Sequence, residues 1–117
     1  SAKNFLIIDA SMSELMRPPL YGAYHEITPT RKGEMPNKVY DVVGPVCESS
    51  DFIGKERKLN CKSGDLLVIQ DVGAYGSVLS SNYNTRPRPA EYMISNSEIK
   101  LIRTSDTLDQ IIENESC

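Results

Sequence analysis

The chain has 117 residues, with 13 Lys and Arg against 16 Asp and Glu, so its net charge is −3. Hydrophobic residues make up 39% and charged residues 25%, which is the composition of a globular domain and not of a disordered segment. This length allows one domain with a real core and excludes a complete α/β barrel. No basic block and no apolar run of the ~20 residues that a membrane helix needs is present. We therefore expect neither nucleic acid nor a membrane as a partner.

Short apolar and β-branched runs dominate the chain and predict a mainly β fold. Turn signals such as Gly44-Pro45 end several of these runs, and Ser95–Glu98 between the last two predicts a hairpin. Strands of this length and spacing are typical of a small β-barrel or sandwich. The six runs are Phe5–Ile8, Ala23–Thr30, Val39–Val43, Leu66–Val72, Tyr92–Ile94 and Ile99–Arg103.

Three short helical segments interrupt the predicted strands. Ser13–Met16 predicts one helical turn that the following prolines stop. Gly76–Asn82 predicts a second short helix. The third, Thr107–Asn114, carries apolar residues on one face, and Thr107 with Gln110 forms the sequence pattern of a capping box.

The cysteines and the single histidine leave little room for metal or disulfide chemistry. Cys47, Cys61 and Cys117 are odd in number and form no C-x-x-C, so we expect neither a structural metal site nor a disulfide framework. A reducing, cytoplasmic location fits this usage. The sequence assigns no role to Cys61 or Cys117.

The first segment with a chemical signature runs from Arg17 to His25 (RPPLYGAYH). A guanidinium on a backbone stiffened by two prolines can hold a carboxylate through two hydrogen bonds, and the phenol of Tyr21 adds a donor. The same residues also fit a proline-rich turn with a solvated arginine. His25, with no acid or second ligand nearby in the sequence, fits a packed histidine.

The second segment, Gly44–Asp51 (GPVCESSD), follows a predicted strand, and such loops often present functional residues. Cys47 stands next to Glu48. A neighbouring carboxylate disfavours the thiolate, so the thiol keeps a proton that it can donate. The alternative is a buried structural cysteine followed by solvated acids.

The third segment begins at Gly73-Ala74-Tyr75-Gly76 and continues to Glu91. Small residues around Tyr75 let a ligand approach the backbone closely and leave the phenol presented. An ordinary turn after a strand is the commoner use of such glycines. Arg86 and Arg88 alternate with prolines, and we expect both to be structural or solvated.

Together these segments resemble the C-terminal domain of the diaminopimelate decarboxylases, a family of pyridoxal-phosphate enzymes of lysine biosynthesis. The matching stretches are DASMSELMRPPLYGAYH, GPVCESSD and GDLLVIQDVGAYGSVLSSNYNTRPRPAEY, in the family's order and over most of residues 5–95. The Cys-Glu-Ser motif distinguishes the chain from ornithine and arginine decarboxylases of the same fold. It departs from the family's usual Gly-Met-Asn-Asp-Leu at residues 11–15, which read SMSEL.

The resemblance implies that residues 1–117 form the Greek-key-like, mainly β C-terminal domain of a fold type III pyridoxal-phosphate decarboxylase. The family's N-terminal α/β barrel carries the cofactor-binding lysine and a glycine-rich phosphate site, and neither motif occurs here. We therefore expect the chain to be a fragment that is inactive alone. Its implied partners are that barrel and a second subunit, because the family's active sites lie at a homodimer interface.

The implied reaction converts meso-2,6-diaminopimelate into L-lysine and carbon dioxide, with pyridoxal 5'-phosphate bound mainly by the N-terminal barrel. By resemblance, Cys47 is the general acid that protonates the reacting carbon. Arg17 and Tyr21 match residues that hold the distal carboxylate, and Glu48 matches the residue that pairs with the distal ammonium. Tyr75 matches a residue that lies against cofactor and substrate. In the family, the counterparts of Cys47 and Glu48 serve the active site of the partner subunit.

Two alternatives remain open from the sequence. The chain fits the same domain of a related pyridoxal-phosphate decarboxylase acting on another amino acid. It also fits an independent β-barrel binding module, although such a module usually carries basic and aromatic residues on its binding face, and only 7% of this chain is aromatic.

Overall fold

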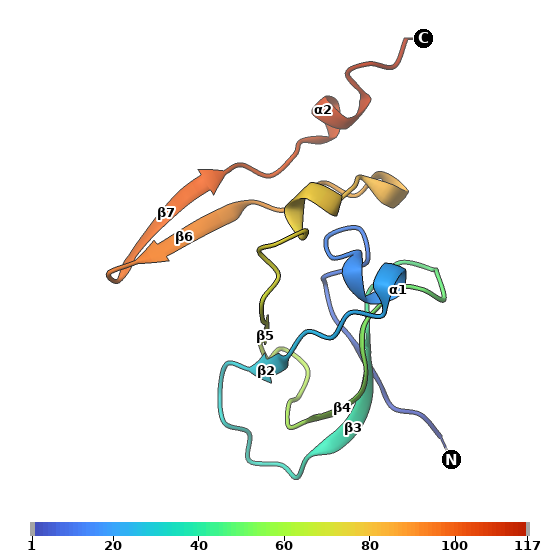
Figure 1. Ribbon diagram of the computed structural model, residues 1–117, viewed down its shortest axis with the longest axis vertical. Helices are drawn as coiled ribbons and strands as arrows, with labels where there is room; N and C mark the ends of the chain where they lie inside the picture. The colour runs from blue at the N-terminus through green and yellow to red at the C-terminus, as the bar shows by residue number, and fades with distance from the viewer. Residues whose placement is uncertain (1, 117) are drawn as a thin grey trace.

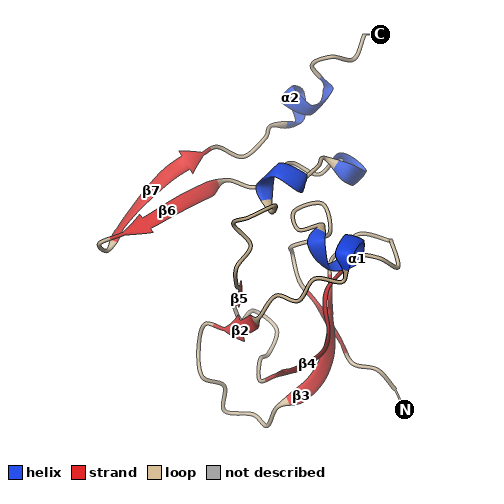
Figure 2. Ribbon diagram, viewed as in Figure 1, coloured by secondary structure: helices blue, strands red, loops and turns tan. Residues whose placement is uncertain are grey.

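The computed structural model describes residues 2–116 and confirms the predicted mainly β fold class, with two short α-helices (Figures 1 and 2). The strands are β1 (Phe5–Ile7), β2 (Ile27–Pro29), β3 (Lys38–Val43), β4 (Phe52–Leu59), β5 (Leu67–Ile69), β6 (Glu91–Ser95) and β7 (Glu98–Arg103). The helices are α1 (Arg17–Tyr21) and α2 (Leu108–Ile112), and the 3₁₀ turns are η1 (Ser77–Leu79) and η2 (Tyr83–Thr85).

The strands form three separate sheets that do not close into a barrel, which was one of the two arrangements, barrel or sandwich, that their spacing predicts. β1 pairs in parallel with β3, and β3 pairs antiparallel with β4; β2 pairs with β5, and β6 with β7, both antiparallel. Within residues 2–116 no strand pairing links one sheet to another. One physical reason is the shortness of β2, whose Pro29 has no N–H to offer a strand on the edge opposite β5.

A small core holds the first two sheets together. Val42 of β3 and Ile53 of β4 are fully buried, and they pack with Leu15, Ile27 and Leu59. Partly buried apolar residues surround this cluster, among them Leu6, Ile8, Tyr40, Cys61, Leu67 and Ile69. The core therefore joins the N-terminal strand, the loop before α1 and both long strands.

The sequence patterns missed β4. Its centre, Lys55-Glu56-Arg57-Lys58, is charged, and only its ends are buried, so it shows no alternation of apolar and polar residues. The pairing with β3 also contains register shifts, and Glu56 adopts a left-handed φ of 53°. The strand is stabilised by its partner β3 and not by its own pattern.

The prolines after Met16 begin a helix, which corrects the prediction that they stop one. The short turn expected before them is present, and in it the N–H of Leu15 donates to the carbonyl of Ser11 at 3.1 Å. Proline is well tolerated in the first helical turn, where its missing N–H has no partner to lose, so α1 starts at Arg17 with Pro18 and Pro19 next. Gly22, with φ 66°, ends α1. The helix expected at Gly76–Asn82 is only the 3₁₀ turn η1.

Two local predictions near the C-terminus are confirmed. Thr107 caps α2 with the reciprocal hydrogen bonds to Gln110 of a capping box. β6 and β7 form the expected hairpin, closed by Asn96 and Ser97, whose φ values of 49° and 65° suit a type I′ turn.

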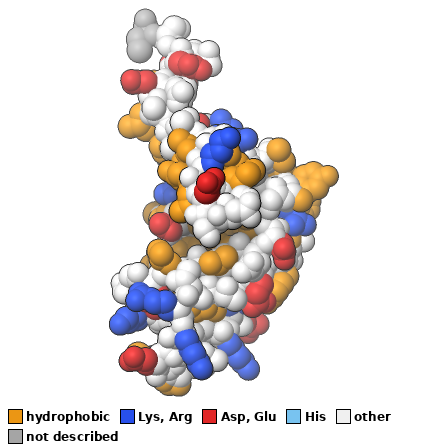
Figure 3. Space-filling view, turned by 90° about the vertical axis from the view of Figure 1, so that its left-hand side faces the viewer, with side chains coloured by type: hydrophobic (Ala, Val, Ile, Leu, Met, Phe, Trp, Pro, Cys, Tyr) orange, Lys and Arg blue, Asp and Glu red, His pale blue; other side chains and the backbone are white. Residues whose placement is uncertain are grey.

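The β6–β7 hairpin projects away from the rest of the molecule (Figure 1) and makes the chain extended. The radius of gyration is 15.8 Å, against about 13.4 Å for a compact domain of this length. The accessible surface is 8723 Å², whereas a monomeric protein of this mass exposes roughly 6300 Å². Exposed apolar side chains contribute to the excess, and several are visible on the face drawn in Figure 3. On the hairpin they include Tyr92, Met93, Ile94, Ile99, Leu101 and Ile102.

Neither of the two helices within residues 2–116 has the length and apolar character required to cross a bilayer.

Candidate functional site

Helix α1 carries two of the predicted site residues at its ends. Arg17 and Tyr21 are four residues apart, so they lie on the same helix face. The helix packs against β4 and lies beside the loop between β3 and β4 (Figure 1). Arg17 is half-buried and Tyr21 is 67% exposed. Their side chains make no hydrogen bond or ion pair to other residues of the described chain, and both remain available to a ligand.

The loop between β3 and β4 is anchored by the buried carboxylate of Asp51. Asp51 Oδ1 accepts a hydrogen bond from the backbone N–H of Met12 at 2.7 Å, and Oδ2 accepts one from Val46 at 2.7 Å. The side chain is 2% exposed. Gly44 makes this arrangement possible, because a Cβ there would lie 2.4 Å from Asp51 Oδ2. Asp51 therefore ties the loop both to itself and to the segment before α1.

Cys47 and Glu48 are exposed on this anchored loop. Glu48 Oε2 accepts a hydrogen bond of 2.7 Å from the phenol of Tyr83, and Glu48 Oε1 lies 3.3 Å from Ser50 Oγ. The hydrogen bond to Glu48 and the negative charge of that carboxylate raise the pKa of Tyr83. The arrangement presents a thiol and an oriented carboxylate to the surroundings.

The turn that contains Tyr83 is itself joined to the segment before α1. Arg86 Nη2 donates to the carbonyl oxygen of Asp9 at 2.9 Å and forms an ion pair with Glu14 at 3.3 Å. The backbone N–H of Ser81 donates to the carbonyl of Ser13 at 2.9 Å. Arg86 thus has the structural role that the sequence predicts.

Tyr75 stands apart from these contacts. It is 65% exposed and has a left-handed φ of 57°, in a tight turn that leads from β5 to η1. At Gly76 a Cβ would come within 2.1 Å of the carbonyl oxygen of Val72, so only glycine fits there. The turn presents the aromatic ring without a hydrogen-bond partner among residues 2–116.

His25 and Cys61 take structural places. His25 is 2% exposed, and its Nδ1 lies 2.9 Å from the carbonyl oxygen of Gln70, so it is the packed histidine of the simpler interpretation. Cys61 packs against the core, and burial together with the charge of Asp65 raises its pKa. Cys117 lies outside the described residues.

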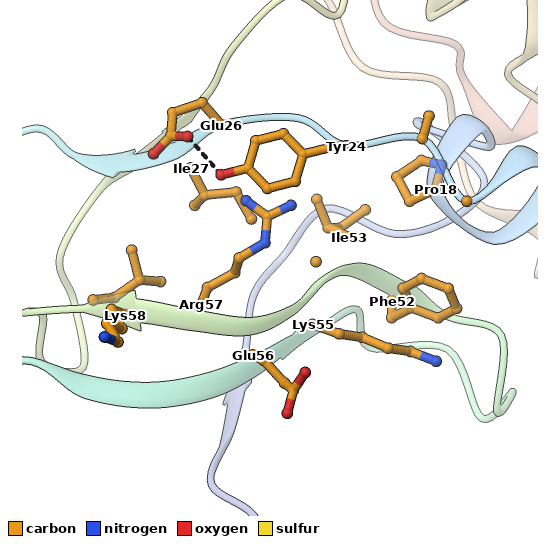
Figure 4. A pocket seen from close by; sticks show the side chains of 14 residues that line it. Pro18, Tyr24, Glu26, Ile27, Phe52, Ile53, Lys55, Glu56, Arg57 and Lys58 are labelled. Carbon is orange, nitrogen blue, oxygen red and sulfur yellow. Dashed lines mark hydrogen bonds between the residues drawn. The ribbon is translucent and has the colours of Figure 1, made fainter.

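A cavity of about 710 Å³ lies between α1 and β4, and Pro18 and Gly22, the chain neighbours of Arg17 and Tyr21, line part of it (Figure 4). Over it, the guanidinium of Arg57 stacks on the ring of Tyr24 at 3.8 Å, and the phenol of Tyr24 donates to Glu26 at 2.6 Å. Arg57 also donates to the carbonyl of His25 at 2.7 Å. These polar groups satisfy one another, and none of the five predicted site residues lines the cavity.

The structure brings Cys47 and Glu48 onto one surface held by two further residues, Asp51 and Tyr83. Arg17 and Tyr21 share the neighbouring helix, and within residues 2–116 no hydrogen bond or ion pair joins Tyr75 to the others. Sequence reasoning did not assign a role to Asp51 or Tyr83, although both stand inside the quoted motifs. The signal for Asp51 was an acid at the start of a strand, after a Gly-Pro turn, where free backbone N–H groups need acceptors.

The sequence model of one protein family, described as the C-terminal sheet domain of pyridoxal-dependent decarboxylases, matches residues 1–73, which is more than half of the chain. The sheets and the anchored loop described above lie largely within this region. The chain therefore belongs to the family of pyridoxal-dependent decarboxylases.

Similar proteins within this family include diaminopimelate decarboxylases. The chain is 50% identical over 114 residues to diaminopimelate decarboxylase of Vibrio cholerae and 47% identical over 113 residues to that of Neisseria meningitidis serogroup B. Each match covers 97% of this chain and 27% of the relative. The chain thus spans about a quarter of the length of these relatives.

Solved structures agree with this similarity. Diaminopimelate decarboxylases from M. jannaschii and Helicobacter pylori, each in complex with L-lysine, superpose with TM-scores of 0.91 and 0.89 at 38% and 41% identity. Each superposition covers 97% of this chain. It covers 26% of the M. jannaschii chain and 28% of the Helicobacter pylori chain. A lysine/ornithine decarboxylase from Vibrio vulnificus matches 70% of this chain and 22% of its own, with a TM-score of 0.62 at 24% identity, which shows a shared fold alone.

Proposed function

We propose that this chain is the C-terminal part of a diaminopimelate decarboxylase, which converts meso-2,6-diaminopimelate into L-lysine and carbon dioxide. The observation that carries the proposal is the anchored loop that exposes Cys47 beside Glu48, in a chain 50% identical to an enzyme of that name. The one domain, residues 1–117, supplies the proton donor and substrate contacts. The rest of the active site belongs to an N-terminal α/β barrel and a second subunit.

The residue chemistry suits a substrate with two zwitterionic ends. Arg17 and Tyr21 on one helix face bind the distal carboxylate, for which a guanidinium offers parallel hydrogen bonds. Glu48 pairs with the distal ammonium. The thiol of Cys47 gives its proton to the carbon that has lost carbon dioxide. A substrate such as ornithine, which lacks the second carboxylate, leaves Arg17 without its partner.

Among residues 2–116, Tyr75 is the residue that we expect to contact pyridoxal phosphate. The exposed ring of Tyr75 can lie flat against a planar pyridine ring, as aromatic pairs do. The helices of residues 2–116 have five residues or fewer and offer no N-terminal cradle for a phosphate. The phosphate and the covalent lysine contacts therefore belong to the N-terminal barrel. When bound, the cofactor would supply an electron sink for the electron pair that stays on the substrate carbon as carbon dioxide leaves.

The exposed surface supports the need for partners. The chain exposes 8723 Å², roughly 2400 Å² more than a monomer of its mass. That excess is larger than the ~800 Å² that each partner contributes to a standard interface. The proposal assigns it to the barrel and to the second subunit of a homodimer, with Cys47 and Glu48 reaching the partner's active site. It also places the enzyme in the cytoplasm, where exposed thiols stay reduced.

The test is a chimaera in which this chain replaces the matching C-terminal segment of the Vibrio cholerae relative. We expect decarboxylation of meso-diaminopimelate and not of ornithine. Cys47→Ala should lower turnover about 10²- to 10⁴-fold, as loss of a positioned proton donor does. L-Lysine should still bind, because the ligand contacts remain.

Mixing two inactive chimaeras tests the contribution across the dimer. One carries Cys47→Ala, and the other lacks the cofactor-binding lysine of the N-terminal barrel. Each mixed dimer then has one intact site and one doubly defective site, so up to about half of the activity per dimer returns if the sites are independent. Mixed dimers that form but stay inactive would refute the crossed arrangement.

A further inference from the structure

The contact between Tyr83 and Glu48 joins two segments that lie 35 residues apart in the sequence. The phenol donates to Glu48 Oε2 at 2.7 Å, and Ser50 Oγ lies 3.3 Å from Oε1. Both carboxylate oxygens therefore have a neighbour that restricts the rotation of an otherwise exposed side chain. A neutral phenol donates one hydrogen and leaves the negative charge of Glu48 available to a cation.

The support behind Tyr83 is well defined. Asn84 and Thr85 follow it with left-handed φ values of 58° and 56°, a conformation that costs energy in residues other than glycine. Asn82 Nδ2 donates to the carbonyl of Arg86 at 3.0 Å and closes the turn. Arg86 in turn is paired with Glu14. Tyr83 is thus held by contacts that do not involve Glu48.

The backbone of Glu48 is held separately by Asp51. The N–H of Asp51 donates to the carbonyl of Glu48 at 3.0 Å, and the Asp51 carboxylate binds Val46. With the backbone anchored at this point, only the side-chain torsions of Glu48 remain free. Ordering them at the moment of substrate binding would cost rotamer entropy, and an existing hydrogen bond removes that cost.

We propose that Tyr83 is a positioning residue that orients the Glu48 carboxylate toward the ammonium group of the substrate. This inference rests on the proposed function for the identity of the ammonium, but the contact itself can be tested without activity. Tyr83 acts through Glu48 and does not touch the reacting atoms.

The chain offers a matched control. The phenol of Tyr24 donates to Glu26 at 2.6 Å, and this hydrogen bond raises the pKa of Tyr24 as the bond to Glu48 raises that of Tyr83. The two pairs have the same chemistry, but Glu26 is not among the proposed substrate ligands. Tyr24→Phe therefore removes an equivalent hydroxyl at a different place.

The first experiment measures tyrosine ionisation in the 117-residue chain by NMR with ¹³C-labelled tyrosine rings. Glu48→Gln should lower the pKa of Tyr83 and leave that of Tyr24 unchanged. Glu26→Gln should lower the pKa of Tyr24 and leave that of Tyr83 unchanged. An unchanged Tyr83 pKa in Glu48→Gln would overturn the proposal, because the two groups would then not interact.

The second experiment uses the active chimaera. Tyr83→Phe should raise KM for meso-diaminopimelate and the inhibition constant of L-lysine together, by about 5- to 20-fold for a lost bond to a charged group. We expect kcat to stay within about twofold, as loss of uniform binding predicts. Tyr24→Phe should leave all three constants unchanged.

A double variant separates positioning from general damage. If Tyr83 acts through Glu48, adding Tyr83→Phe to Glu48→Gln should produce no further loss. Additive losses would overturn the proposal. If Glu48→Gln itself leaves KM unchanged, Glu48 is not a substrate ligand. The role proposed for Glu48 and the positioning role of Tyr83 then both fail. The tyrosine titration would still report whether Tyr83 and Glu48 are in contact.

Discussion

Replacing Asp51 by asparagine tests the anchor of the Cys47–Glu48 loop with almost no change in volume. Both carboxylate oxygens accept backbone hydrogen bonds of 2.7 Å in a site that is 2% exposed. An amide has one oxygen, so either Met12 or Val46 loses its acceptor and faces an NH₂ group. The remaining bond changes from charge-assisted to neutral.

The expected cost follows from these two changes. Losing a buried bond to a charged group costs about 1.5–3 kcal/mol, and weakening the second costs about 1 kcal/mol more. We therefore expect Asp51→Asn to lower the free energy of unfolding by about 2.5–4 kcal/mol, a large part of the ~5–15 kcal/mol of an ordinary domain. Gly44→Ala should act in the same direction, because its methyl group would lie 2.4 Å from Asp51 Oδ2.

Urea unfolding of the chain, followed by circular dichroism, measures the effect, with Asp9→Asn as the matched control. The Asp9 side chain is exposed and makes no hydrogen bond or ion pair within residues 2–116. We expect its variant to stay within about 0.5 kcal/mol of the parent, as surface substitutions do. If Asp51→Asn is no less stable than Asp9→Asn, the carboxylate does not anchor the loop.

Three further outcomes are expected. Iodoacetamide should modify exposed Cys47 before Cys61, whose pKa is raised by burial, and peptide mass spectrometry after short exposures would reveal the opposite order. Hydrogen bonds from Asn82 and Arg88 hold the pKa of Asp106 at about 2 instead of 3.8. Their contact should therefore persist down to about pH 3, be half lost near pH 2 and disappear below it; an Arg88 amide NMR shift whose midpoint lies near pH 4 would contradict it. Ile53→Ala, at a fully buried core position, should lower the free energy of unfolding by about 2–5 kcal/mol in urea titrations, and a loss below 1 kcal/mol would be inconsistent with the core described.

Much of what the sequence predicted depends on interactions over a few residues. The capping box of Thr107 and Gln110 and the hairpin turn at Asn96 and Ser97 involve neighbours in the chain, and both are present. The error at α1 was also local: two prolines are compatible with the first turn of a helix as well as with its end. The motif around Cys47 pointed to the right family for the same reason, because it is a contiguous stretch of residues.

The sequence by itself determined the mainly β class, the short helix caps and the segments that carry the chemistry. Only the tertiary structure decided that β4 forms despite its charged centre, that Asp51 is buried beside Met12, 39 residues earlier, and that Tyr83 reaches Glu48 across 35 residues. Local preferences act along the chain and can be read from it. Contacts between distant segments depend on which strands pair and on how loops pack. The sequence around Asp51 can mark an acid that precedes a strand, but the carboxylate becomes an anchor only when folding brings the N–H group of Met12 to it.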